Sequence, residues 1–208
     1  MLGRRESQKK QREARILRAA SALFARQGFE RTTMQDIARR SRLAVGTIYN
    51  YFRSKPEIIL ALVQRDTLAG LQAGEAVLKD PPRDPVAAVQ LLLERAVEPF
   101  ALHDRSLWRE LTAAALKDPE LTQGFFAADV RLIALVAALL RELRARGDLR
   151  QDLDPDRGAV CLYGIFFSWW IAHLTNEGIS LEMLRAELRS GVSLVMTGYL
   201  ERAQGGSP

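Results

Sequence analysis

The residues best suited to chemistry are hydroxyl and amide side chains in VGTIYNYFRSK, residues 45–55. Ile48–Phe52 alternates apolar and polar residues as a strand would, but Ala44, Ile48 and Phe52 also recur at every fourth position. A helix of about two turns would bury those three together. Its outer face would carry Gly46, Thr47, Tyr49 and Asn50. Such side chains form hydrogen bonds, and on a short helix they suit base edges in the DNA major groove.

Side-chain catalysis is not indicated. His103 and His173 are seventy residues apart, no serine or cysteine has a nucleophile setting, and no glycine-rich phosphate loop occurs. Cys161, the single cysteine, has no disulfide partner and no ligand at metal spacing. We therefore expect no catalytic residue, metal site or cofactor. The basic start lacks a following apolar segment, so no signal peptide is indicated and a cytoplasmic location is expected.

Charge divides the chain into two parts. Residues 1–55 contain fourteen Lys or Arg and four Asp or Glu, whereas residues 56–208 contain sixteen and twenty-one. The first part therefore carries +10 and the second −5, within a total of +5. This distribution predicts a basic module that binds a polyanion and an acidic body with another task. The alternative is a basic tail that is merely solvated.

The helical spacing of apolar residues and the residues that start and end helices predict an all-α protein. Asp84-Pro85, Asp118-Pro119 and Asp154-Pro155 combine a capping carboxylate with proline at the first helical position. Gly28, Gly147 and Gly178 are placed to end helices in the left-handed conformation. The Thr32–Gln35 spacing predicts a capping box at another helix start. The expected helices are 7–27, 32–40, 44–52, 55–79, 85–101, 104–117, 119–146, 155–177 and 181–203.

One long motif resembles a known family. The pattern ILRAASALFARQGFERTTMQDIARRSRLAVGTIYNYFRSKPEIILALV, residues 16–63, is similar to the DNA-binding domain of the TetR (tetracycline repressor) family of bacterial transcriptional regulators. The resemblance implies nine helices in two domains. A three-helix helix-turn-helix domain at 1–55 would precede a larger effector-binding and dimerisation domain at 56–208.

The resemblance also implies roles in binding double-stranded DNA. Phosphates would be contacted by Thr33, Tyr49, Tyr51 and Lys55, and base edges by Val45, Gly46 and Thr47. Asn50 could contact either. Tyr49 and Tyr51 could instead pack against the fourth helix. Arg4, Arg5, Lys9 and Lys10 would form either a disordered arm on the DNA or a solvated tail.

Two positions depart from the family pattern. Ser41-Arg42 stands where the family usually has Ala-Gly in the turn between the two short helices. If residue 42 has positive φ, arginine costs ~1 kcal/mol relative to glycine, and its guanidinium would be free to reach a phosphate. Met34 cannot form a bidentate base contact, so its helix should contribute little to sequence recognition.

The body contains a helix that is apolar on nearly every side. Residues 158–174 are short for a membrane span and no second span is evident, so we expect no membrane and burial of this helix by its own domain and a second subunit. With the last helix it would form a four-helix homodimer interface, as in the family. The predicted interface residues are Tyr163, Phe167, Leu184, Leu188, Val192, Val195 and Tyr199. Gly191 and Gly198 would allow close approach.

The resemblance implies a small-molecule pocket among aromatic residues elsewhere in the body, although for each residue taken singly a place in the core is favoured. They are Phe100, His103, Trp108, Phe125, Phe126, Phe166, Trp169 and Trp170. The expected protein is a homodimeric repressor that binds a palindromic operator and is released by a small, mostly apolar effector. An enzyme is disfavoured. The remaining alternative is a spatial or nucleoid-associated DNA-binding protein without an effector.

Overall fold

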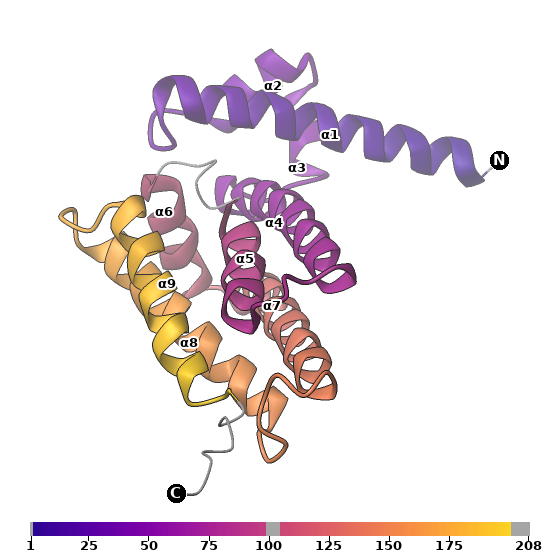
Figure 1. Ribbon diagram of the computed structural model, residues 1–208. Coiled ribbons are helices and arrows are strands. Elements are labelled where there is room, and N and C mark those ends of the chain that lie inside the picture. Colours follow the sequence, from indigo (N-terminus) through magenta and orange to yellow (C-terminus); the bar gives the residue numbers. More distant parts are fainter. Residues whose placement is uncertain (1, 99–104, 201–208) are drawn as a thin grey trace, which may run out of the picture. The chain divides into compact units, whose positions relative to one another are not determined.

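The computed structural model describes the backbone of residues 2–98 and 105–200 (Figure 1). Within these ranges it contains nine α-helices, and the extended structure is limited to an isolated bridge between Leu149 and Leu200. The helices are α1 Leu2–Gln27, α2 Met34–Ser41, α3 Val45–Tyr49, α4 Lys55–Lys79, α5 Pro85–Val97, α6 Arg105–Ala115, α7 Pro119–Ala145, α8 Pro155–Thr175 and α9 Leu181–Thr197. The all-α prediction is confirmed.

The aspartate-proline pairs begin α5, α7 and α8 as predicted. Asp84 Oδ1 accepts a hydrogen bond from Val86 N at 3.0 Å, and Asp118 Oδ1 accepts one from Glu120 N at 2.9 Å. Asp154 Oδ1 accepts from Asp156 N at 3.0 Å. Each carboxylate therefore satisfies a backbone donor that has no partner inside its helix.

The glycine predictions are confirmed at two positions of three. Gly28 and Gly147 have φ of 81° and 84°, the left-handed values that end α1 and α7 without a Cβ clash. Gly178 does not have positive φ. Asn176 ends α8 instead in an extended conformation, and its side-chain Oδ1 accepts from Gly178 N at 2.9 Å.

Two helix starts differ from prediction. The capping box of α2 uses Thr33 and Asp36 rather than Thr32 and Gln35. Thr32 is buried, and its hydroxyl donates to Gly28 O at 2.7 Å. Helix α1 begins at Leu2, so the basic segment expected as a disordered arm or a tail is the first part of a helix. The mixture of Arg, Glu, Gln and Lys there has good helix propensity, which explains the extension.

The chain divides into two compact units. One comprises residues 1–66 and 103–125, and the other residues 67–102 and 126–208. The first unit therefore includes α6 and the start of α7 as well as the helix-turn-helix segment. Its core comprises Ile16, Ala20, Ile37, Ile48, Ile58, Leu62 and Leu111.

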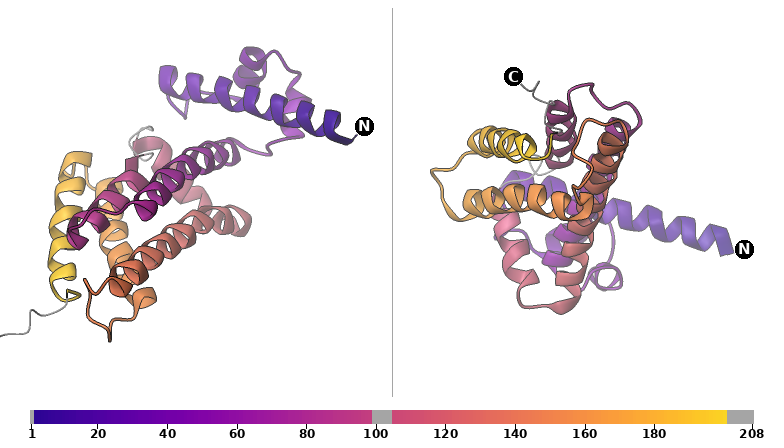
Figure 2. Two further views of the ribbon diagram at one scale, coloured as in Figure 1. Left: turned by 45° about the vertical axis from the view of Figure 1, so that its right-hand side comes forward. Right: turned by 60° about the horizontal axis from the view of Figure 1, so that its bottom comes forward.

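The second unit is built on long apolar helices. Helix α9 packs beside α8 and α5 (Figures 1 and 2). Gly191 on α9 lies against α8, where an added Cβ would be 2.8 Å from Ile165 Cγ2. The core comprises Val89, Leu92, Leu93, Val136, Leu139, Leu140, Leu143, Leu162, Phe166, Leu184, Leu188 and Val192.

Among the described residues, two helical segments are long and apolar enough to cross a membrane, namely Thr122–Ala145 and Pro155–Thr175. The expectation that the second has no companion is therefore wrong. Length and composition are weak evidence here, because a core helix of a soluble protein has the same character.

The turn between α2 and α3 contains a strained residue. Arg42 has φ 53° and ψ 46°, and it is the non-glycine residue with positive φ in the described part of the chain. Arg42 N donates to Arg39 O at 3.2 Å and Leu43 N to Ala38 O at 3.0 Å. These two hydrogen bonds form a Schellman motif, in which glycine is the usual residue at this position.

Replacing Arg42 with glycine should remove this strain. We expect Arg42→Gly to raise the free energy of unfolding by roughly 0.5–1 kcal/mol, because glycine adopts positive φ without a Cβ clash. Arg40→Gly, within α2, is the matched control and should lower it by about 1 kcal/mol. Urea unfolding of both variants measures the difference, and destabilisation by Arg42→Gly would contradict the strain argument.

Candidate DNA-binding surface and regulatory body

Helix α3 presents the predicted surface. Ile48 is fully buried and Phe52 is 7% exposed, so they anchor the segment as expected. Ala44 is exposed and does not join that buried stripe. Gly46, Tyr49 and Asn50 are exposed, whereas Val45, Thr47 and Tyr51 are half-buried. At 48% exposure, the Tyr49 ring lies largely in solvent, where a phosphate or base could meet it.

Thr33 has a structural task beside its predicted phosphate contact. Its hydroxyl donates to Asp36 Oδ2 at 2.7 Å and accepts from Asp36 N at 3.1 Å. Asp36 Oδ2 also accepts from Thr33 N at 2.9 Å. The hydrogen bonds from Thr33 lower the pKa of Asp36, which keeps the cap ionised. A phosphate contact from this hydroxyl would have to compete with the cap.

An arginine that the sequence did not single out holds the turn. Arg15 on α1 donates from Nε and Nη2 to Ser41 O at 2.9 and 2.6 Å, and from Nη2 to Arg42 O at 2.9 Å. These carbonyls lie at the end of α2, where helical partners are missing. The guanidinium fork therefore ties the middle of α1 to the turn that leads into α3.

Lys55, which is predicted to contact a phosphate, already has partners within the chain. Its Nζ donates to Phe29 O at 2.8 Å and to Glu30 O at 3.4 Å, and it lies 4.1 Å from the Phe29 ring centroid. The ammonium thus fastens the start of α4 to the loop after α1. A contact with DNA phosphate stays a prediction, and it would use the remaining N–H.

Arg53 links three segments of the first unit. Its Nε donates to Glu57 Oε1 at 2.6 Å, and its Nη2 pairs with Glu120 at the start of α7. The hydrogen bonds and charges of Glu57 and Glu120 raise the pKa of Arg53. Because Arg53 and Glu120 lie largely at the surface, salt should weaken the ion pair between them.

The predicted effector residues whose side chains are described differ in burial. Phe166 and Trp170 are buried and their ring centroids are 6.3 Å apart, while Trp169 is half-buried and Phe126 is exposed. Trp108 is buried and belongs to the first unit. Phe100, His103 and the Phe125 side chain lie outside the described residues.

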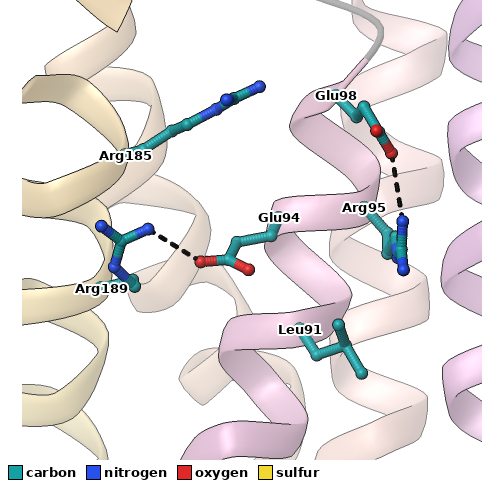
Figure 3. A pocket seen from close by; sticks show the side chains of 6 residues that line it. All are labelled: Leu91, Glu94, Arg95, Glu98, Arg185 and Arg189. Carbon is teal, nitrogen blue, oxygen red and sulfur yellow. Dashed lines mark hydrogen bonds and ion pairs between the residues drawn. The ribbon is translucent and has the colours of Figure 1, made fainter. Parts of the chain in front are cut away.

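A pocket of about 300 Å³ lies between α5 and α9 (Figure 3). It is lined by Leu91, Glu94, Arg95, Glu98, Arg185 and Arg189. None of the predicted aromatic residues is among these lining residues. The pocket is therefore a charged feature that the sequence did not indicate.

Asp129 on α7 is a half-buried acid. One carboxylate oxygen, Oδ2, is buried without a partner, and the side chain is hydrogen-bonded to Tyr163 of α8. Burial raises the pKa of Asp129 to about 6, and the bond from Tyr163 opposes that shift. Burial and the negative charge of Asp129 raise the pKa of Tyr163, so that hydroxyl stays protonated.

The predicted interface residues divide into two groups. Leu184 and Val192 are fully buried within one chain and Leu188 is 2% exposed, so their assignment to the dimer contact is wrong. They pack inward because they belong to the core that α9 shares with α8 and α5. Tyr163, Phe167, Val195 and Tyr199 are half-buried. Gly191 likewise serves packing within the chain, against Ile165.

Other apolar side chains on the same helices face outward. Val160 on α8 is 55% exposed, and Leu194 on α9 is 77% exposed. Such exposure leaves apolar surface in water that a partner could cover. Sequence periodicity indicated that α8 and α9 were apolar. It did not indicate which of their apolar side chains would be exposed to solvent in the single chain.

Comparisons with known proteins agree with the structure. Residues 16–62 match the model of the bacterial regulatory proteins of the tetR family. The HTH-type transcriptional repressor KstR of Rhodococcus jostii is 29% identical over 79% of this chain and 72% of its own length. Over residues 16–62 the chain carries the DNA-binding domain of the TetR family. It is a DNA-binding transcriptional regulator.

Full-length similarity extends through the body. UidR of Escherichia coli K12, an HTH-type transcriptional regulator, is 23% identical over 89% of this chain and 95% of its own. The crystal structure of the TetR-family repressor FadR from Thermus thermophilus, in complex with lauroyl-CoA, superposes with a TM-score of 0.73. It is 27% identical and the match covers 94% of this chain and 98% of that one. These relatives are regulators rather than enzymes.

Two substitutions in this TetR-family module should separate phosphate from base contacts. Tyr49→Phe should weaken binding several-fold on all DNA sequences, because it removes a hydroxyl donor to phosphate without changing the packing. Thr47→Ala should instead change the preference among operator variants by about 1–3 kcal/mol per affected base pair. Binding is measured by fluorescence anisotropy on a set of single-base variants. A change of preference in Tyr49→Phe would contradict its assignment.

Asp129 should make stability depend on pH. Its folded-state pKa of about 6 lies above the ordinary aspartate value of 3.8. The stability that protonated Asp129 contributes is therefore complete below about pH 4 and is lost as the pH rises through 6. Asp129→Asn cannot ionise. It should therefore be more stable than the wild type by about 1–2 kcal/mol at pH 7.5, with little difference at pH 4. Urea unfolding across this range provides the measurement, and a difference independent of pH would contradict the assignment.

Proposed function

We propose that the protein is a cytoplasmic homodimeric repressor that binds a pseudo-palindromic operator and is released by a small, mostly apolar effector. The exposed outer face of α3, in a segment of net charge +10, is the observation that carries this proposal. Hydroxyl, amide and glycine residues on that face suit base edges, and the surrounding cations suit phosphates. The named DNA-contacting residues remain Thr33, Arg42, Val45, Gly46, Thr47, Tyr49, Asn50, Tyr51 and Lys55.

Dimerisation would give the protein two recognition helices. Val160 and Leu194 are exposed apolar residues on α8 and α9, and the half-buried Phe167 and Tyr163 stack with centroids 5.9 Å apart. These contacts support a two-fold interface on the outer sides of α8 and α9. Two α3 helices related by a two-fold axis would bind half-sites about one helical turn apart.

An apolar effector is supported by the composition of the second unit and by a similar protein. FadR of Thermus thermophilus, a repressor, was crystallised with lauroyl-CoA, which carries an apolar chain. A comparable ligand would release this protein if it bound the DNA-free form better. A preference of ~100-fold supplies ~2.7 kcal/mol of coupling, and DNA must then weaken the ligand by the same factor.

Selection of genomic fragments by the purified full-length protein tests the proposal. At low and near-physiological salt, we expect one or a few palindromic sites to remain bound, because base contacts persist when phosphate contacts are screened. Many scattered sites that all disappear with added salt would contradict an operator-specific repressor and favour a spatial or nucleoid-associated role. Lauroyl-CoA, with lauric acid and coenzyme A as controls, is the first probe for release.

Leu194→Glu tests the dimer within the same experiment. A carboxylate on this outward stripe should disrupt the dimer, and operator affinity should fall at least 100-fold while the helical content stays unchanged. Leu116→Glu is a matched control, because Leu116 is 84% exposed and lies just after α6. Equal effects of the two substitutions would argue against an interface at Leu194.

A further inference from the structure

The α5–α9 pocket is built from two helical faces. Leu91, Glu94 and Arg95 on α5, with Glu98 just after it, have the spacing of one helix face. Arg185 and Arg189 lie one turn apart on α9. Gln90 Nε2 bridges the helices by donating to Arg189 O and Ser193 Oγ, both at 3.0 Å. This cross-link holds the two faces at a defined separation.

The charges in the pocket are unevenly paired. Arg189 Nη1 lies 3.1 Å from Glu94 Oε1, and Arg95 Nη1 lies 3.5 Å from Glu98 Oε2 (Figure 3). The side chain of Arg185 extends into the space between the helices and makes no hydrogen bond or ion pair with the described residues. Three guanidiniums and two carboxylates leave the pocket with one excess positive charge.

We propose that this pocket binds the carboxylate or phosphate group of a small organic anion. Arg185 is its main ligand, Arg189 its second, and the carbon part of the ligand lies against Leu91. The site is additional to the DNA surface and to the apolar effector of the proposed function. It concerns binding alone and does not depend on operator recognition.

The arrangement selects for an oxyanion. A guanidinium offers a planar fork of N–H donors that matches two oxygens of a carboxylate or phosphate. Arg185 and Arg189 repel one another at one-turn spacing, and a bound anion between them removes that repulsion. A cation would instead have to displace an arginine from Glu94 or Glu98. The volume of about 300 Å³ exceeds the needs of a bare ion and suits a small ligand with an apolar part.

Binding can be followed at the arginine itself. The probes are phenyl phosphate and benzoate, with benzyl alcohol as the uncharged control, at constant ionic strength. In ¹⁵N–¹H spectra of the full-length protein, the Arg185 Nε–Hε signal should shift saturably with at least one of the two anions and stay in place with benzyl alcohol. A stronger response to one anion identifies phosphate or carboxylate as the preferred group.

Three variants decide whether the site is specific. Arg185→Gln should weaken the anion about tenfold, whereas Arg157→Gln, on the exposed side of α8, should leave binding unchanged. Glu94→Gln frees Arg189 and should tighten binding several-fold, which loss of folding could not produce. Equal binding by the wild type and Arg185→Gln, or no shift of the Arg185 signal with either anion, would overturn the proposal. Operator binding by Arg185→Gln should remain at wild-type strength, so failure of this site is distinguishable from failure of the repressor function.

Discussion

The contact between Arg15 and the α2–α3 turn determines how the recognition helix is presented. A five-residue helix such as α3 has too few internal hydrogen bonds to hold its own orientation. Three hydrogen bonds from the Arg15 guanidinium to Ser41 O and Arg42 O attach the turn to the 26-residue helix α1. Buried Ile48 fixes the other side of α3. The outer face of α3 is therefore positioned by one polar and one apolar contact.

Several polar residues of the first unit that we assign to DNA binding also hold its structure together. Thr33 caps α2, and Lys55 joins the start of α4 to the carbonyls of Phe29 and Glu30. Such residues are already oriented before DNA arrives, which reduces the entropy lost on binding. Because each of these side chains has a structural contact as well as a proposed DNA contact, its substitution would affect both. A charge that closes a turn can also face a phosphate.

The two units depend on different interactions. The first surrounds a small apolar core with cations, and its helix ends are closed by hydrogen bonds. The second is held by long apolar faces on α7, α8 and α9, with close approach at Gly191. Two polar features depart from this apolar character. Asp129 is half-buried beside Tyr163, and the α5–α9 pocket keeps charged groups at an edge where solvent still reaches them.

Sequence alone determined the helices, most of their ends and the outward face of α3, because these follow from local periodicity, capping and backbone sterics. It raised the condition of positive φ at Arg42, and the structure meets that condition. Tertiary structure alone decided that Arg15 holds the turn, that Lys55 bonds a loop 25 and 26 residues away, and that Leu184 and Val192 face inward. A periodic apolar stripe shows that a helix face is buried. Which neighbour covers it depends on how distant helices pack, and no local pattern contains that information.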